Sequence, residues 1–362
     1  MTFALDHIGF SVGEEAMIDD VSLTLQQGTM NVLLGPTLAG KTTLMRLMAG
    51  LDKPSTGRII ANGVDVTNVP VRRRSVAMVY QQFVNYPSLS IYENIASPLR
   101  VAGLARTEIE ARVKEAARFL RLDTMLSRMP AQLSGGQQQR TAIARALVKR
   151  ADLVLLDEPL ANLDYKLREE LREEMPRIFA QTGAILVYAT TEPTEALLLG
   201  GTTITLREGR VTQVGPTAQV YRRPDNIDAA RVFSDPPLNE LAVRKAGPLV
   251  ILENGRNLPA VAVLSRLPDG DYRLGFRVDA VVIGDPQPSS LSFPGQVAVT
   301  EISGSERFVH VDVGAGVWVC LATGVEDWQP GAKVDVRVDA NRAFVFGASG
   351  KLAVTPTIAR TA

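Results

Sequence analysis

The stretch that most constrains the fold is GPTLAGKT, which runs from Gly35 to Thr42. It follows the apolar run MNVLL and precedes the helical pattern TTLMRLMAG. The spacing G-x-x-x-x-G-K-[ST] lets backbone N–H groups curl around phosphate oxygens at the start of a helix, whose dipole also favours an anion. A strand, this loop and a helix in that order predict an α/β fold that binds a nucleotide at a strand end.

The same stretch supplies candidate ligands for ATP and Mg²⁺. Lys41 would place its charge on the β and γ phosphates, and the hydroxyl of Thr42 would bind Mg²⁺. The other expected nucleotide-binding residues here are Gly35, Pro36, Thr37, Leu38, Ala39, Gly40 and Thr43.

A second apolar run, ADLVLLDEP, ends in two acids. Asp157 stands at the tip of this predicted strand, where its carboxylate would hold Mg²⁺. Glu158 follows, and it could polarise an attacking water as a general base. The run therefore predicts a metal ligand and a catalytic group beside the phosphate loop.

A third segment, AQLSGGQQQRTAIARAL, places Ser134, Gly135, Gly136 and Gln137 at the start of a predicted helix. A serine and glycine amides at a helix start form a second anion-binding cradle. Within a single fold of this length, the two cradles cannot both reach one nucleotide. We therefore expect a dimer in which this cradle closes on the nucleotide of the other subunit.

The chain has 362 residues, of which 46% are apolar, and this is enough for two cores. Residues 1–235 alternate short apolar strands with helical patterns, and the stretch 88–150 is rich in helix. Within it, TEIEARVKEAARFL has capping-box spacing at Thr107 and Glu110, followed by an apolar helical face. After the linker-like SDPPLNEL, residues 236–362 consist of short alternating strands that predict an all-β domain.

Composition excludes several classes of protein. Lys+Arg and Asp+Glu are both 39, so the zero net charge gives no reason to expect nucleic acid as a partner. A single cysteine, Cys320, excludes an internal disulfide framework. We see no signal peptide, and the apolar runs are shorter than a membrane span needs. If the chain works at a membrane, a partner must hold it there.

The motifs together resemble the nucleotide-binding subunit of an ABC (ATP-binding cassette) transporter, a P-loop NTPase with a RecA-like core and a helical subdomain. By this resemblance Gln81, or Gln82 as a one-residue alternative, would sense Mg²⁺ in the loop that meets the membrane subunits. Asp164 would lie in the loop that crosses the dimer interface. The C-terminal part resembles the OB-type (TOBE) regulatory domain of maltose-type import ATPases. The resemblance implies two transmembrane permease subunits, a periplasmic substrate-binding protein, and a peripheral position on the cytoplasmic face of the bacterial inner membrane.

The sequence departs from the family pattern at two positions. Val12 stands where an aromatic residue usually stacks on adenine, and Phe10 lies two positions earlier on the same predicted strand face. Thr191, in YATTEPTEALLLGG, stands where a histidine would contact the γ-phosphate and organise the attacking water. The only two histidines of the chain are His7 and His310. Losing one preorganised donor costs about 10²–10³ in rate, so we expect this site to hydrolyse ATP slowly.

Several hypotheses stay open. In the first, the chain pairs with a second, non-identical ATPase subunit that has the histidine, as in the proteobacterial glycerol importers that YATTEPTEALLLGG resembles. In the second, two copies form a homodimer that imports a sugar or glycerol 3-phosphate, and Thr191 works well enough with Glu158. Other classes are a non-transport cassette ATPase acting on DNA or ribosomes, and a regulatory subunit that does not hydrolyse ATP.

Overall fold

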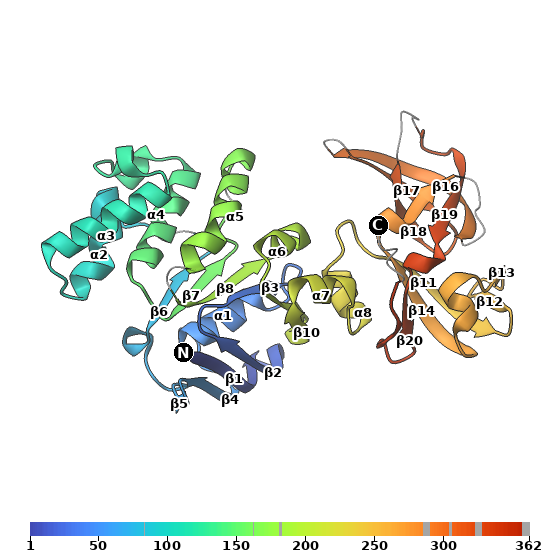
Figure 1. Cartoon of the computed structure of the whole chain (residues 1–362), viewed down its shortest axis with the longest axis horizontal. Coiled ribbons are helices and arrows are strands. Elements are labelled where there is room, and N and C mark those ends of the chain that lie inside the picture. The colour runs from blue at the N-terminus through green and yellow to red at the C-terminus, as the bar shows by residue number, and fades with distance from the viewer. Residues whose placement is uncertain are drawn as a thin grey trace. The chain divides into compact units, whose positions relative to one another are not determined.

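The computed structural model describes residues 1–82, 84–161, 163–180, 183–284, 290–303, 306–322 and 328–356. The chain divides into two compact units, Met1–Ala218 and Gln219–Ala362 (Figure 1). This division falls earlier than the boundary expected near residue 235, because helix α8 (Ile227–Val232) packs its Ile227 and Ala230 against phenylalanines of the C-terminal unit. None of the helices in these ranges has the length and apolar character needed to span a membrane.

A six-stranded sheet forms the centre of the N-terminal unit, in the order β10-β9-β3-β8-β7-β6. The pairs β6–β7, β7–β8, β8–β3 and β3–β9 are parallel, and β7 and β8 are buried along their whole length, as their continuous apolar sequences predict. The strands span Met30–Leu34 (β3), Val76–Val79 (β6), Leu153–Asp157 (β7), Ile185–Thr190 (β8), Thr202–Arg207 (β9) and Arg210–Pro216 (β10).

A second, antiparallel sheet has the order β2-β1-β4-β5. Its apolar face shares one core with β3 and helix α1, including Leu5, Ile8 and Ile18 from the sheet and Leu44 and Met45 from the helix. The elements span Thr2–Val12 (β1), Glu15–Gln26 (β2), Thr56–Ala61 (β4), Val64–Asp65 (β5) and Lys41–Ala49 (α1).

Three helices, α2 (Ile91–Val101), α3 (Arg106–Phe119) and α4 (Gly135–Val148), group at one end of this unit and form the expected helical subdomain (Figure 1). The apolar face predicted for α3 is buried. The predicted capping box at Thr107 is wrong, because α3 begins earlier, with Ala105 as its N-cap and Thr107 inside its first turn. The other helices of the unit are α5 (Tyr165–Ala180), α6 (Pro193–Leu199) and α7 (Thr217–Arg222), the last of which runs across the division between the units.

The C-terminal unit contains two antiparallel sheets, of order β13-β12-β11-β14-β20-β21 and β15-β19-β16-β17-β18, around one apolar core. This all-β arrangement is consistent with the expected OB-type domain. Strand β11 begins at Asn239, so SDPPLNEL is a shorter linker than expected. The strands span Asn239–Ala246 (β11), Leu249–Leu252 (β12), Asn257–Pro259 (β13), Gly270–Phe276 (β14), Val281–Ile283 (β15), Ser290–Ser303 (β16), Glu306–Asp312 (β17), Val317–Ala322 (β18), Lys333–Asp339 (β19), Phe344–Gly347 (β20) and Leu352–Val354 (β21). Short 3-10 helices span Val71–Arg73, Asp123–Met125, Pro130–Gln132, Ala262–Arg266, Val278–Ala280 and Ala340–Arg342.

Candidate nucleotide site

The glycine-containing loop joins the end of β3 to the start of α1, as its sequence predicts. Gly40, the N-cap of α1, has φ 99°, a left-handed conformation that favours glycine. A Cβ on Gly35 would lie 2.3 Å from the carbonyl oxygen of Leu206 on β9, so only glycine fits there. Both glycines are therefore needed to fold the loop over the carboxyl end of β3.

Lys41 is held inside this loop, with only 5% of its surface exposed. Its Nζ donates hydrogen bonds to the carbonyl oxygens of Gly35, at 2.8 Å, and Pro36, at 3.0 Å. Burial lowers the pKa of Lys41, although the carboxylates of Glu158 and Asp157 act in the opposite direction. The ammonium group thus lies at the centre of the loop, where a bound phosphate would accept the same hydrogen bonds.

A hydroxyl and a carboxylate meet beside this lysine. The Thr42 hydroxyl donates a hydrogen bond of 2.7 Å to Asp157 Oδ2 at the end of β7. Burial raises the pKa of Asp157, and the hydrogen bond from Thr42 partly opposes that shift. Paired hydroxyl and carboxylate oxygens are the donors that Mg²⁺ prefers, so the two residues fit the expected metal ligands.

Glu158 joins the same group. Its backbone has a positive φ of 45°, and its amide donates to the carbonyl oxygen of Ala189 on β8. Gln81 Nε2 donates to Glu158 Oε2 at 2.8 Å, and Lys41 Nζ lies 3.7 Å from Glu158 Oε1. The structure therefore brings together residues that are far apart in the sequence, and the glutamate is oriented by two neighbours.

Thr191 follows β8 directly and is exposed. The amide of Gly35 donates to the carbonyl oxygen of Thr190 at 3.3 Å, which places the residue after it next to the phosphate loop. His7 lies on β1, where its Nδ1 contacts Asp20, and His310 lies on β17 of the C-terminal unit. Neither histidine belongs to the strand ends that carry the site.

The predicted helix start at Ser134 is present as the N-cap of α4. The Ser134 hydroxyl accepts a hydrogen bond from the Gln137 amide, and the Gln137 side chain accepts one from the Ser134 amide. Gly135 and Gly136 form the first turn. Asp164 similarly caps α5 by accepting from the Leu167 amide. Capping hydrogen bonds thus order the starts of both helices.

Val12 and Phe10, the residues considered for the adenine platform, lie near the end of β1. Val12 is 61% exposed at the end of β1, opposite Glu15. Phe10 is partly buried and packs against the core of the N-terminal unit. The aliphatic side chain of Val12 offers a base less contact than an aromatic ring does.

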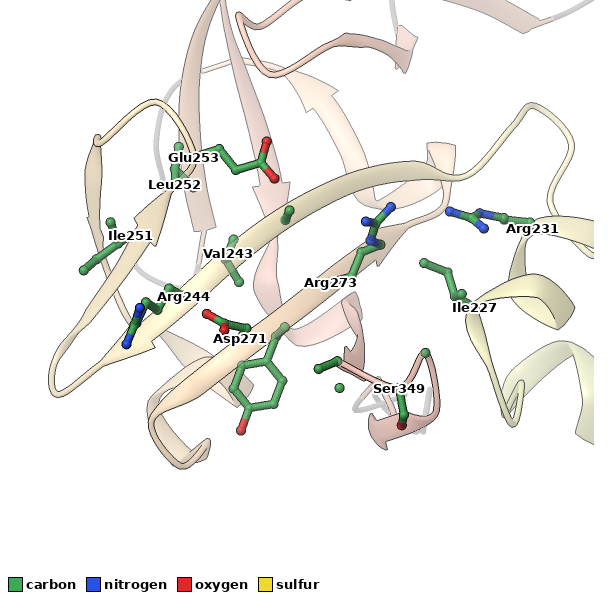
Figure 2. A pocket seen from close by; sticks show the side chains of 15 residues that line it. Ile227, Arg231, Val243, Arg244, Ile251, Leu252, Glu253, Asp271, Arg273 and Ser349 are labelled. Carbon is green, nitrogen blue, oxygen red and sulfur yellow. The ribbon is translucent and has the colours of Figure 1, made fainter.

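A cavity of about 680 Å³ lies in the C-terminal unit, over β11, β14 and the turn that contains Ser349 (Figure 2). Figure 2 shows the guanidinium groups of Arg231 and Arg273 near one end of it. Both arginines already contact Glu240, which accepts two hydrogen bonds from Arg231 and one from Arg273. The cavity shares no residue with the phosphate loop, so it is not the nucleotide site.

Comparison with known proteins agrees with this geometry. A model of the ABC transporter family matches residues 18–161. The trehalose/maltose import ATP-binding protein MalK of Thermococcus litoralis is 35% identical over 356 residues, covering 92% of this chain and 94% of that protein. The chain belongs to the ABC transporter family. The sn-glycerol-3-phosphate import ATP-binding protein UgpC 3 of Rhizobium etli is 34% identical over 92% of this chain and 94% of its own length.

Among solved structures, the dimeric ATP-binding cassette MJ0796, in a post-hydrolysis state with ADP and Pi, is 28% identical. It superimposes with a TM-score of 0.55 and covers 59% of this chain and 98% of its own. The family and this neighbour identify the chain as an ATP-binding protein that hydrolyses ATP.

Sequence reasoning missed one group of residues near the site. Arg168 and Arg172 on α5 form ion pairs with Glu192 and Glu195, which follow β8. Arg172 and Glu195 are buried. The signal available in the sequence was the spacing of the two arginines, which places them on one face of a helix.

Proposed function

We propose that this chain is the ATP-hydrolysing subunit of an importer for a small polyol or sugar, with glycerol as the first candidate. The observation that carries this proposal is the coverage of the similarity. MalK and UgpC 3 match across 92% of the chain, so the likeness extends beyond the cassette into the all-β unit. Glycerol itself rests on the resemblance of YATTEPTEALLLGG to one chain of the glycerol importers.

In this proposal Gly35–Thr43 surrounds the ATP phosphates, and Lys41 exchanges its loop carbonyls for phosphate oxygens. Thr42, Asp157 and Gln81 would hold Mg²⁺, which when bound neutralises phosphate charge. Glu158 accepts a proton from the attacking water, and the amide of Gln81 orients its carboxylate for that role.

The second cradle acts in trans. Ser134, Gly135, Gly136 and Gln137 close on the nucleotide held by another cassette, and Asp164 lies at that interface. The capping hydrogen bonds at the starts of α4 and α5 support this. They order the first turn of each helix, and they are not made to this chain's own phosphate loop. Two permease subunits bind near the loop after Gln81, and a periplasmic substrate-binding protein delivers the solute. The chain therefore works at the cytoplasmic face of the inner membrane.

The partner cassette in this proposal is a second, non-identical ATPase subunit that has a histidine at the position of Thr191. A threonine hydroxyl can donate one neutral hydrogen bond, whereas a histidine can also carry charge. The chain's own site is then the slow one, and its intact cradle serves the faster site of the partner. Retention of Glu158 with its hydrogen bond from Gln81 favours slow turnover over none.

Transport by the reconstituted complex tests the proposal. The complex purified from the native host would be placed in vesicles with ATP on the cassette side and radiolabelled glycerol, maltose, glycerol 3-phosphate or putrescine opposite. ATP-dependent uptake of a polyol or sugar is expected, with loss of uptake when Lys41→Ala removes the phosphate-binding ammonium group. Uptake of putrescine alone would contradict the assigned solute class.

A further inference from the structure

The first turns of α5 are linked to two neighbouring loops by the side chain of Arg168. Its Nη2 donates to the carbonyl oxygens of Ala161, at 3.3 Å, and Leu163, at 3.4 Å, in the loop that follows Glu158. Its Nη1 donates to Glu192 Oε1 at 3.2 Å. One planar guanidinium thus contacts the loop after β7 and the residue after Thr191 at the same time.

A second arginine, one turn further along α5, forms ion pairs with the same segment after β8. Arg172 Nη2 lies 3.3 Å from Glu195 Oε1 and 3.6 Å from Glu192 Oε2. Glu195 Oε2 in turn accepts hydrogen bonds from the Thr190 hydroxyl, at 2.6 Å, and from the Tyr188 hydroxyl, at 3.2 Å. Because Arg172 and Glu195 are both buried, these contacts are shielded from water and from salt.

These contacts fix Thr191 from both sides. Thr190 is held by Glu195 through its hydroxyl, and its carbonyl oxygen accepts the Gly35 amide of the phosphate loop. Glu192 is held by Arg168 through its carboxylate, and its amide donates to the Thr190 hydroxyl at 3.0 Å. The backbone at 191 therefore has little freedom of its own and must follow its neighbours.

We propose that Arg168 is a positioning residue that couples the loop containing Ala161 and Leu163 to the residue at position 191. A shift of that loop moves the guanidinium, and the ion pair with Glu192 carries the shift to the γ-phosphate side of the site. The inference rests on the proposed role of Thr191 beside the γ-phosphate. It goes beyond that role by naming what sets the position of this residue.

The competing explanation is that the Arg168–Glu192 pair only stabilises the fold. Both side chains are partly exposed, and such pairs contribute little to stability. A positioning role instead predicts a change in kcat without a matching change in KM. Misplacement of a reacting group by about 1 Å or less lowers rates by up to about 100-fold.

The test uses the purified full chain, in which every site is this chain's own, and measures kcat and KM for ATP together with Tm. Arg168→Ala should lower kcat by at least about fivefold, while KM changes by less than about twofold and Tm stays near that of the wild type. Arg168→Lys should recover only part of the rate, because a single ammonium group cannot reproduce the planar fork of donors by which a guanidinium contacts both loops. The matched control is Arg177→Ala, which removes an exposed arginine from the same helix and should leave kcat unchanged.

Combining these variants with Thr191→His separates the two proposals. With Arg168 present, the histidine should raise kcat by at least about tenfold, and in the Arg168→Ala background by less than about twofold. An equal gain in both backgrounds would overturn the coupling and leave the slow-site proposal intact. If the histidine gives no gain even with Arg168 present, the slow-site proposal fails, and the coupling is then judged by Arg168→Ala alone. An unchanged kcat in that single variant overturns it.

Discussion

Replacing Thr191 by histidine is the most informative single change in this chain. The preceding residue is tied to the phosphate loop by the 3.3 Å hydrogen bond between the Gly35 amide and the Thr190 carbonyl oxygen, so the backbone is already in place. The side chain at 191 is exposed, so a larger ring requires no rearrangement of the core. The variant therefore tests the chemistry of the side chain with little risk to the fold.

The expected gain follows from the charge that a histidine can carry, because threonine and neutral histidine each donate one hydrogen bond. One preorganised donor to the transition state contributes about 10²–10³ in rate. Thr191 already supplies a neutral hydroxyl donor, so the gain from Thr191→His should fall below this range, at about 10- to 100-fold in kcat. The imidazole has an ordinary pKa near 6.5, so beside the phosphates it can take up a proton and supply a charged donor, which the threonine hydroxyl cannot do.

Two matched variants identify the source of any change. Thr191→Ser keeps the hydroxyl and should keep the wild-type kcat. Thr191→Val keeps the side-chain shape but loses the donor, and should lower kcat below that of the wild type. The assay is steady-state release of phosphate by the purified chain, with ATP affinity measured separately by equilibrium binding. If the histidine variant binds ATP normally, keeps its Tm and is no faster than wild type, the residue at 191 does not limit this site.

Three further predictions concern the site and the core of the C-terminal unit. Because burial raises the pKa of Asp157 in the folded chain, its ionised form disfavours folding at every pH above the pKa of the unfolded chain, and this cost disappears as the pH falls below that value. Asp157→Asn should therefore raise Tm at pH 7 while it lowers hydrolysis, and a fall in Tm would contradict this sign. Gly35→Ala places a Cβ 2.3 Å from the Leu206 carbonyl oxygen, and the shift needed to relieve this overlap should weaken ATP binding by more than about tenfold, as measured by equilibrium titration. Cys320 is buried and its pKa is raised to about 12, so iodoacetamide at pH 8 should label it only after unfolding; rapid labelling of the native chain would contradict the placement of this thiol.

The phosphate loop, the acidic strand end and the helical cradle could be predicted because their function depends on local sequence. Gly35 and Gly40 act through the backbone that they themselves form, and Lys41 extends its ammonium group into the same loop. Asp157 only needs to follow a buried strand. The continuous apolar sequences of β7 and β8 predict a parallel sheet for the same reason. Each of these predictions uses information within about a dozen residues, the range over which periodicity and capping operate.

The features that sequence reasoning missed depend on contacts between distant segments. Arg168 reaches Glu192 only because α5 packs against α6, whose N-cap is Glu192, and no periodic pattern reports that approach. Regular alternation would put Phe10 on the strand face of Val12, but β1 has register irregularities on both sides of Phe10, and its side chain packs against the core. Helix α8 belongs with the C-terminal unit because Ile227 meets the phenylalanines of β20, which lie more than a hundred residues away in the sequence.

The central claim is that this chain is one half of an unequal motor. The most direct measurement is to tag the chain in its native host, purify the intact membrane complex and determine every ATPase subunit and its amount by mass spectrometry. We predict a second cassette subunit, in equal amount, with a histidine at the position that Thr191 occupies here. A complex whose only ATPase is this chain would contradict the claim, because two copies would then drive transport without that histidine.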